Sequence, residues 1–332
     1  MFKGKTILVT GGAGSFGKRL VKTLCKRYDP KKVIVYSRDE GKHFDLRAEL
    51  DAPALRLFIG DVRDIERLNQ AMRGVDLVVH AAALKQVPAA EYNPMECLKT
   101  NVHGAENVIN SALLNDVPKV IALSTDKAAN PVNLYGASKL AADKLFVAGN
   151  NVSGGHPTRL SVVRYGNVAG SRGSVVPFFK QRLRDGRDLP ITDEKMTRFW
   201  ITLQQGVEFV IRSFERMQGG EIFVPKIPSM RILDLVAALD PDAPTRTTGI
   251  RPGEKLQEVL CPADDSHLVL EFEDHYVIRP SIKFYDLDVD YSVNPLNERG
   301  RPVDPGWEYN SRDNPHFLTV EELRRLDEEV EG

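Results

Sequence analysis

Lys5-Thr6-Ile7-Leu8-Val9-Thr10 runs directly into Gly11-Gly12-Ala13-Gly14-Ser15-Phe16-Gly17 close to the N-terminus. The first part is a short apolar run of the kind that is buried on both faces of a parallel sheet. Small residues in the second part permit a tight turn and let backbone N–H groups approach a pyrophosphate at the start of a helix. This pattern predicts a dinucleotide-binding fold. The expected contacts in the turn are Gly11, Gly14, Ser15, Phe16 and Gly17.

Strand-like and helix-like stretches alternate from this turn to about residue 150. The further expected strands cover residues 33–37, 54–59, 76–80, 117–125 and 160–165. The expected helices cover residues 64–73, 94–115 and 133–149. Such alternation predicts an α/β fold of the Rossmann type, a doubly wound parallel sheet with right-handed crossovers. Ligands of such sheets bind beyond the carboxyl ends of the strands.

Polar side chains at the tips of the expected strands indicate which dinucleotide binds. Ser37, Arg38 and Lys42 follow the second strand. An arginine there accommodates a 2′-phosphate, whereas a carboxylate accepts a hydrogen bond from a ribose 2′-hydroxyl. These residues favour NADP over NAD; the alternative is that Arg38 is a solvated loop residue beside Asp39. The further expected cofactor contacts are Asp61, Val62, Ala81, Ala82, Ala83, Lys85, Tyr135, Lys139 and Asn167.

A second decisive stretch, Ser124-Thr125-Asp126-Lys127, follows the fifth expected strand, and Tyr135-Gly-Ala-Ser-Lys139 comes soon after it. Positions i and i+4 lie on one face of a helix, so Lys139 is expected behind the Tyr135 phenol. A positive charge there would lower the tyrosine pKa from about 10. Such a tyrosine can take a proton from an alcohol as hydride leaves the carbon. An exposed i,i+4 pair is the alternative for the spacing alone.

The composition changes after residue 167 toward prolines and charged loops. We therefore expect residues 1–167 to form an NADP-binding Rossmann core and residues 168–332 to form mainly a smaller C-terminal substrate-binding lobe. Segments around 200–224 are expected to return to the core, because an amphipathic helix near residues 203–217 can cover the sheet. The last fifty or so residues are polar, with an acidic helix at 320–331, and indicate no chemistry.

Cations in the second half of the chain are candidates for holding an anionic substrate. For each of them alone, a surface charge is the alternative. Arg172 and Arg251 lie beside glycines, and arginine offers a bidentate fork, so these two are expected at a diphosphate. The full set of expected substrate contacts is Lys85, Thr125, Tyr135, Asn167, Arg172, Val175, Lys180, Thr192, Arg198, Arg251 and Glu254.

Charge and composition exclude several other classes of protein. The 332 residues carry 45 basic and 46 acidic side chains, for a net charge of -1, so no basic field invites nucleic acid or an anionic membrane. The three cysteines lack C-x-x-C spacing, and the seven histidines lack ligand spacing, so neither disulfides nor a metal site are expected. No signal peptide or membrane-spanning run is recognisable, which predicts a cytoplasmic location.

Several motifs together resemble the extended short-chain dehydrogenase/reductases that modify nucleotide sugars. They are Thr10-Gly-Gly-x-Gly-x-x-Gly17, Ser124-Thr-Asp-Lys127, Tyr135-x-x-x-Lys139, Tyr36-Ser-Arg-Asp-Glu40, Gly60-Asp-Val-Arg-Asp64, Ala81-Ala-Ala-Leu-Lys85, Val163-Arg-Tyr-Gly-Asn-Val168, Gly170-Ser-Arg-Gly-Ser-Val-Val-Pro-Phe-Phe179, Met196-Thr-Arg-Phe-Trp-Ile-Thr202 and Ile250-Arg-Pro-Gly-Glu-Lys255. Within that group the chain resembles the short soluble UDP-N-acetylglucosamine 4,6-dehydratases that invert C5 and open pseudaminic acid biosynthesis. The resemblance extends to about residue 280.

Two details distinguish relatives within this resemblance. The glucose-type 4,6-dehydratases carry Asp-Glu where this chain has Asp126-Lys127. The membrane-attached enzymes that retain C5 share Asp-Lys, but they usually replace the tyrosine and carry an N-terminal membrane region. The presence of Tyr135 therefore favours inversion. The remaining alternatives are a C5-retaining dehydratase, a UDP-sugar 4-epimerase, and a catalytically silent NADP-sensing regulator.

The resemblance implies a closed redox cycle with named roles. Tyr135 would deprotonate the C4 hydroxyl, aided by Thr125, while Lys139 holds the cofactor ribose. Lys127 would remove the C5 proton, and Asp126 would protonate the departing C6 hydroxyl. An ammonium has no lone pair, so we expect burial and the charge of Lys139 to lower the pKa of Lys127. The resembled enzymes often assemble as hexamers, so a homo-oligomer is expected.

Overall fold

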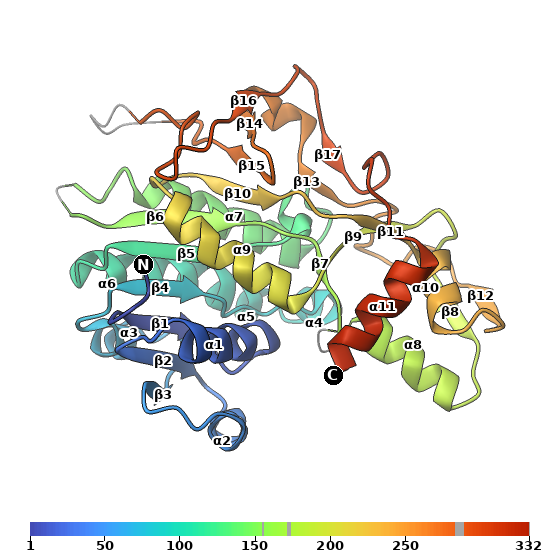
Figure 1. Cartoon of the computed structure of the whole chain (residues 1–332), viewed down its shortest axis with the longest axis horizontal. Coiled ribbons are helices and arrows are strands. Elements are labelled where there is room, and N and C mark those ends of the chain that lie inside the picture. Colours follow the sequence, from blue (N-terminus) through green and yellow to red (C-terminus); the bar gives the residue numbers. More distant parts are fainter. Residues whose placement is uncertain (155, 171–173, 283–288, 332) are drawn as a thin grey trace.

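A computed structural model describes residues 1–154, 156–170, 174–282 and 289–331 of the chain (Figure 1). A ten-stranded sheet forms the centre of this described part, in the order β16-β14-β15-β10-β6-β5-β4-β1-β2-β3. Its strands are β1 (Thr6–Thr10), β2 (Lys32–Ser37), β3 (Leu55–Ile59), β4 (Leu77–His80), β5 (Lys119–Leu123), β6 (Arg159–Val163), β10 (Ile222–Pro225), β14 (Val269–Glu271), β15 (His275–Ile278) and β16 (Arg301–Pro302). Neighbours from β3 across to β10 run parallel, whereas β15, β14 and β16 add antiparallel pairs.

The parallel part of the sheet confirms the predicted α/β fold of the Rossmann type. Helices α1 (Ser15–Arg27) and α9 (Leu203–Arg216) pack together on one face, and α3 (Ile65–Met72), α6 (Gly104–Leu114) and α7 (Leu134–Gly149) line up on the other (Figure 1). Helix α2 (Glu40–Glu49) follows β2 at the outer end. Both faces are therefore covered, which explains why the central strands are almost continuously apolar.

Helix α9 shows how the local sequence produces this packing. Thr202 caps its N-terminus by accepting from the backbone N–H of Gln205, while the Gln205 side chain accepts from the backbone N–H of Thr202. The buried positions Val207, Val210 and Phe214 recur at helical spacing and face the sheet. Residues from the second half of the chain thus complete the core of the first half.

A second hydrophobic cluster lies apart from the sheet and involves Phe179, Ile191, Trp200 and Leu235. It is built from separate segments, and α11, near the C-terminus, packs on α10 (Figure 1). The elements here and between the two clusters are α8 (Val175–Arg184), β7 (Asn167–Val168), β8 (Leu189–Ile191), β9 (Thr197–Ile201), β11 (Ser229–Arg231), α10 (Ile232–Leu239), β12 (Thr245–Thr247), β13 (Val259–Cys261), η3 (Ala263–Leu268), β17 (Tyr309–Asn310) and α11 (Val320–Glu331). The division of the chain at residue 167 stays a prediction.

The long helix expected at 94–115 is interrupted. After α4 (Val87–Tyr92) and α5 (Pro94–Leu98), residues Lys99–His103 form a π turn, η1, before α6 begins. Asn101 in this turn bonds both backbone groups of Leu84, at 2.8 and 2.9 Å, and donates to Ser138 Oγ at 2.9 Å. Local widening of a helix is a frequent device at functional sites. Here it accompanies a buried amide that joins the segment after β4 to α7.

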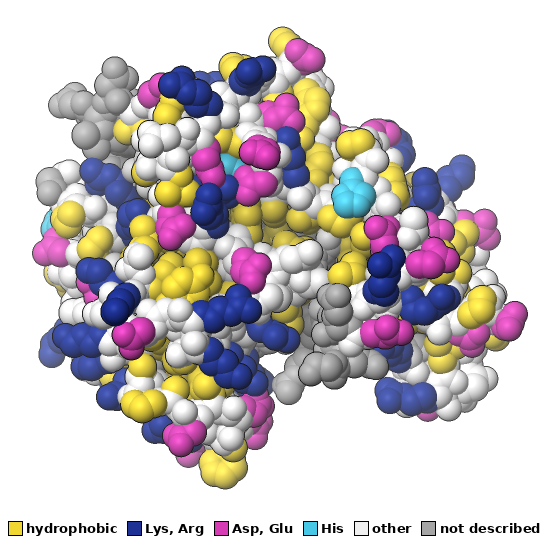
Figure 2. Space-filling model, viewed as in Figure 1, with side chains coloured by type: hydrophobic (Ala, Val, Ile, Leu, Met, Phe, Trp, Pro, Cys, Tyr) yellow, Lys and Arg dark blue, Asp and Glu magenta, His cyan; other side chains and the backbone are white. Residues whose placement is uncertain are grey.

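Charged side chains of both signs are interspersed over the face of the molecule in Figure 2, in keeping with the net charge of -1. Within the described ranges, none of the helices combines the length and the apolar character that a membrane crossing requires.

His80, at the end of β4, makes stability depend on pH. Its ring is buried, and Nδ1 lies 2.8 Å from Thr10 Oγ1. Burial and the charge of Lys139 lower the pKa of His80 to about 3. The pKa of a histidine in an unfolded chain is about 6.5, so below that pH His80 is protonated in the unfolded state and still neutral in the folded state. The folded state therefore loses stability as the pH falls from about 6.5 toward 3.

We expect His80→Gln to remove this acid sensitivity. The acid-dependent decrease in the free energy of unfolding should become shallower by up to about 1.4 kcal/mol per pH unit. Denaturant titrations across this pH range measure the slope. His103→Gln is the matched control, because that side chain is 60% exposed beside Glu106. An unchanged slope in the His80 variant would show that the buried ring is not the titrating group.

Candidate active site

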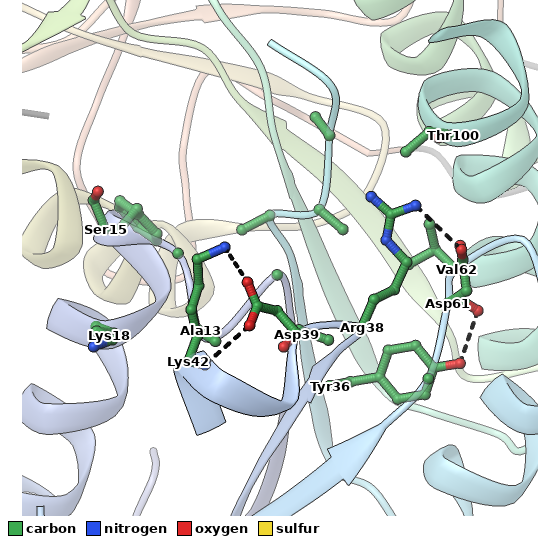
Figure 3. Close-up of a pocket in the computed structure, with 18 of the residues that line it drawn as sticks. Ala13, Ser15, Lys18, Tyr36, Arg38, Asp39, Lys42, Asp61, Val62 and Thr100 are labelled. Carbon is green, nitrogen blue, oxygen red and sulfur yellow. Dashed lines mark hydrogen bonds and ion pairs between the residues drawn. The ribbon is translucent and has the colours of Figure 1, made fainter. Parts of the chain in front are cut away.

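A cavity of about 510 Å³ lies beyond the carboxyl ends of β1 to β4 (Figure 3). Most of the cofactor residues expected from the sequence line it: Gly11, Gly14, Ser15, Phe16, Ser37, Arg38, Lys42, Asp61, Val62, Ala81, Ala82, Ala83 and Lys85. The structure adds Ala13, Lys18, Tyr36, Asp39, Gly60 and Thr100 to this lining. Gly17, Tyr135, Lys139 and Asn167 lie outside it. The strand order therefore brings segments far apart in the sequence to one crevice.

The glycine turn packs directly on the segment after β4. Gly11 has φ of +65°, and a Cβ built there would lie 2.8 Å from the backbone nitrogen of Ala82. No larger residue fits this position without moving one of the two loops. The close approach leaves the backbone of both loops open to the cavity, at the N-terminus of α1, which is a favourable place for a phosphate group.

Arg38 stands at the mouth of the cavity (Figure 3). Its Nη1 lies 3.4 Å from Asp61 Oδ2, and the same oxygen is 2.8 Å from Arg63 Nη2. Burial raises the pKa of Asp61, but the hydrogen bonds and charge of Arg63 and the charge of Arg38 outweigh it, so the pKa is lowered. The Arg38 side chain is 53% exposed. Because Arg63 already neutralises Asp61, Arg38 has donors left for another anion.

The stretch after β5 forms a single turn of 3₁₀ helix, η2 (Asp126–Ala128). Thr125 Oγ1 donates to Asp126 Oδ1 at 2.8 Å, and Lys127 Nζ lies 3.1 Å from the same oxygen. Gly136, at the start of α7, touches this turn so closely that an added Cβ would lie 2.2 Å from the carbonyl oxygen of Lys127. The turn and the helix that carries Tyr135 and Lys139 are thus held together.

The charge environment of these groups differs from the one expected. Burial lowers the pKa of Lys127, but the carboxylates of Asp126 and Glu258 outweigh burial and raise it, so the predicted lowering was wrong. Burial raises the pKa of Tyr135 to about 12, so the predicted lowering of this pKa was wrong as well. The cation that lowers the Tyr135 pKa is Lys127 rather than Lys139, and a hydrogen bond with Thr125 lowers it further. Burial lowers the pKa of Lys139, opposed by Asp143.

Glu258 is a site residue that sequence analysis missed. It is buried, and its Oε1 lies 3.3 Å from Lys127 Nζ and 3.7 Å from Arg198 Nε. The segment before it also contacts the end of η2, because Lys255 Nζ donates to the carbonyl of Ala129 at 2.7 Å. In the sequence, Glu258 was marked only by its place three residues after the Ile250–Lys255 motif. That position does not indicate that its side chain contacts Lys127.

The structure spreads the expected substrate contacts over two groups. Arg198 donates hydrogen bonds to the carbonyls of Thr197, Leu256 and Lys255, so its guanidinium holds the backbone of residues 255 and 256 in place. Lys180 on α8 lies 2.6 Å from Asp327 on α11.

The other expected substrate contacts lie on separate segments of the second half of the chain. Arg251 pairs with Glu254, and Thr192 Oγ1 donates to Glu254 at 3.2 Å. Asn167 on β7 has a buried Oδ1 without a hydrogen-bond partner among the described residues, and Val175 begins α8. Arg172 lies outside the described residues.

Comparison with known proteins finds one matching protein family and several similar proteins. The polysaccharide biosynthesis protein family matches residues 7–280. The chain belongs to this family. A UDP-N-acetylglucosamine 4,6-dehydratase (inverting) from Campylobacter jejuni subsp. jejuni serotype O:2 is 60% identical over 333 residues, and the match covers 100% of both chains. A UDP-glucose 4-epimerase from Rickettsia canadensis is 44% identical over 285 residues, 84% of each chain. The resemblance predicted from the motifs is confirmed.

Solved structures of other proteins share the fold of this polysaccharide biosynthesis protein. The X-ray structure of Pen from Bacillus thuringiensis has a TM-score of 0.88 at 34% identity and covers 100% of this chain and 99% of its own. DesIV from Streptomyces venezuelae, a dTDP-glucose 4,6-dehydratase with NAD bound, has a TM-score of 0.68 at 25% identity, covering 76% and 86%. The cavity beside the glycine turn therefore belongs to a fold that holds a nicotinamide dinucleotide in DesIV.

Proposed function

We propose that this protein is a UDP-N-acetylglucosamine 4,6-dehydratase that inverts C5. The observation that carries the proposal is the contact between the buried Asp126 and the partly buried Lys127 beside Tyr135. Oxidation of an alcohol needs Tyr135 alone, whereas elimination of water needs a separate base and acid. Full-length identity of 60% to an enzyme of that name supports the same reading. The product would be UDP-2-acetamido-2,6-dideoxy-β-L-arabino-hex-4-ulose.

The cavity suits a nicotinamide dinucleotide. Gly11 and Ala82 approach within a distance that no side chain would permit, and the α1 N-terminus lies beside them. When bound, the cofactor supplies a two-electron acceptor for C4 and a donor for C6. The residues of the chain would bind and orient this dinucleotide. Lys139 would hold its ribose, and the alanines 81–83 would lie against its flat nicotinamide ring.

Proton transfers by side chains account for the rest of the reaction. Tyr135 as phenolate would take the C4 hydroxyl proton, and Thr125 would hold that hydroxyl. Lys127 as amine would take the C5 proton, and Asp126 would give its proton to the departing C6 hydroxyl, which leaves as water. Two protons leave the sugar, one departs in water and one returns to C5. Return from the opposite face inverts that centre.

Product analysis by NMR tests this proposal. Purified protein incubated with UDP-N-acetylglucosamine in deuterated water should release a 4-keto-6-deoxy sugar of L configuration with deuterium at C5. A C5-retaining enzyme would give the D configuration, and an epimerase would lose no water and gain no deuterium at C5. A regulator would give no product at all. Any of these three results would refute the proposal.

We further propose that NADP is the cofactor. Arg38 is half exposed at the cavity mouth, and its guanidinium is shared only weakly with Asp61, at 3.4 Å. An arginine in this position can pair with a ribose 2′-phosphate. Lys42 lies on the same rim, although its ammonium pairs with Asp39 (Figure 3). NAD in DesIV shows that a relative with this fold uses the other dinucleotide.

Arg38→Asp should therefore shift preference from NADP toward NAD. The substitution removes the partner of the 2′-phosphate and adds a carboxylate that repels it, so NADP should bind at least about tenfold more weakly. Binding titrations with both dinucleotides measure the ratio. Lys32→Asp, at the opposite end of β2, is the control for a charge reversal. Unchanged selectivity in the Arg38 variant would assign Arg38 to the solvated loop.

Two further expectations from the resemblance remain proposals. We propose that the protein forms a homo-oligomer, a hexamer as in the resembled family, and that it works in the cytoplasm on a soluble UDP-sugar. Sedimentation of the purified protein at several concentrations tests the assembly.

A further inference from the structure

Glu258 approaches Lys127 from a segment that sequence reasoning did not connect to the reaction. Oε1 lies 3.3 Å from Lys127 Nζ, and the side chain is only 3% exposed. On the other side of the ammonium, Asp126 Oδ1 lies at 3.1 Å, with a side chain only 1% exposed. The Lys127 ammonium therefore contacts two buried carboxylates. A single carboxylate would be enough to neutralise its charge.

The two carboxylates have spare capacity. The second oxygens, Asp126 Oδ2 and Glu258 Oε2, are buried and lack a hydrogen-bond partner in the part of the chain that the structure describes. Buried carboxylate oxygens are normally satisfied, so such exceptions call for an explanation. A carboxyl group that gains a proton turns one acceptor into a donor and loses its charge. Both groups are thus suited to exchange a proton with the lysine between them.

Glu258 is held firmly in this position. Its backbone N–H donates to Ser311 Oγ at 3.0 Å, and its carbonyl accepts from the Ser311 N–H at 2.8 Å. Arg198 approaches the carboxylate at 3.7 Å while binding the carbonyls of the residues just before it. A surface glutamate that happened to meet a lysine would not be fixed from two other segments. The charged or titratable groups around Lys127 are Asp126, Glu258, Arg198, Tyr135 and Lys255.

We propose that Glu258 takes a proton from the Lys127 ammonium and so releases Lys127 as the amine that removes the C5 proton. This role rests on the proposed function and makes Glu258 a positioning residue, since it acts through Lys127. One N–H bond of the ammonium breaks and one O–H bond forms on Glu258. An ion pair becomes a neutral pair, and the total charge of the site is unchanged.

The other carboxylate closes the proton balance. The cycle requires Asp126 to start protonated on Oδ2, the oxygen without a hydrogen-bond partner among the described residues. After the amine has taken the C5 proton, Lys127 is again an ammonium, and Asp126 has given this Oδ2 proton to the departing hydroxyl. Lys127 lies 3.1 Å from Asp126 Oδ1 and can return that proton to it. The amine is then restored while Glu258 stays protonated. Glu258 thus prepares the base, and Asp126 resets it.

Glu258→Gln tests this role because glutamine keeps the shape and one acceptor oxygen but cannot take a proton. Two rates are compared: reduction of the dinucleotide, which reports oxidation at C4, and entry of deuterium at C5 from deuterated water. We expect C5 exchange to fall by about 10²- to 10⁴-fold relative to C4 oxidation, the range for loss of an acid–base group. Reduced dinucleotide should accumulate. Glu258→Asp, which keeps an acid, should recover part of the exchange.

A purely electrostatic role predicts a different result. Loss of the carboxylate would then only lower the pKa of Lys127, and the glutamine variant would keep its full maximal rate with a pH profile moved to lower pH. That profile, or an equal loss of both rates as expected from a structural role, would overturn the inference. If the glutamine variant unfolds, the aspartate variant decides: an unchanged ratio of the two rates overturns the inference.

The wild-type protein and a control variant separate this inference from the proposed function. Wild-type protein that releases no product would refute the reaction and this role together. Wild-type turnover with an unaffected Glu258→Gln variant would refute the role of Glu258 alone. Glu271→Gln is the matched control, because Glu271 forms an exposed 2.7 Å pair with Lys226 far from the turn. Its ratio of C5 exchange to C4 oxidation should equal that of the wild type.

Discussion

Lys127→Ala is expected to abolish dehydration, by about 10²- to 10⁴-fold or more, while dinucleotide binding persists. Lys127 is the base proposed for C5, and alanine leaves no group in its place. The cavity that would hold the dinucleotide is lined by other residues, so affinity for it should be retained. C4 oxidation should slow as well, because the charge of Lys127 lowers the pKa of Tyr135. Product formation and dinucleotide affinity are measured on the same preparation.

The substitution also leaves Asp126 and Glu258 buried without their shared cation, which destabilises a fold. The unfolding temperature must therefore be recorded with the rates. Lys226→Ala, which breaks the exposed pair with Glu271, is the matched control and should keep full activity. Loss of folding or of dinucleotide binding in Lys127→Ala would assign Lys127 a structural role in place of the catalytic one.

Tyr135→Phe should stop the reaction at its first step. Removal of the phenol oxygen takes away the proposed base for the C4 hydroxyl, a loss of about 10²- to 10⁴-fold. No reduced dinucleotide should form in a single turnover, in contrast to Glu258→Gln, in which it should accumulate. Tyr165→Phe is a suitable control, since Tyr165 is a buried neighbour with no assigned role. Retained C4 oxidation in the Tyr135 variant would contradict the assignment.

The wild-type pH profile tests the same residue. The pKa of Tyr135 is raised to about 12, so only a small fraction is phenolate near neutral pH. That fraction grows about tenfold with each pH unit below the pKa. The rate of C4 oxidation should therefore increase between about pH 7 and 9 and should show no plateau there. A plateau would mean that bound ligands lower the pKa of Tyr135 well below its value in the protein alone.

The fold was accessible from the sequence because its signals are local. The apolar strands, the glycine turn and the helical spacing of α9 each depend on a few neighbouring residues. The parallel strand order then places Arg38, Asp61 and the alanines 81–83 at one edge without further information. The π turn at Lys99–His103 was missed, because it accompanies contacts of Asn101 with Leu84 and Ser138 that only the folded chain provides.

The electrostatics of the site were not accessible in this way. The expectation that Lys139 would govern both Tyr135 and Lys127 followed from sequence spacing. The pKa of Lys127 is instead raised by two carboxylates, that of its sequence neighbour Asp126 and that of Glu258, which arrives from a distant segment. Arg198 illustrates the same point: a cation near a motif suggests a substrate, whereas its donors bind the backbone of residues 255 and 256. The pKa of a buried group and the partners of a cation thus depend on residues that are near in the fold but distant in the sequence.

The contact between Ser311 and Glu258 has a consequence for how the protein is made. Domains of a growing chain fold in order of synthesis, from the N-terminus onward. The residues that line the dinucleotide cavity, the last of which is Thr100, are therefore synthesised early. The position of Glu258 beside Lys127 is fixed only after residues near the C-terminus have been translated and have paired with β13. A chain that ends before Ser311 would lack the two backbone bonds that hold Glu258 in place.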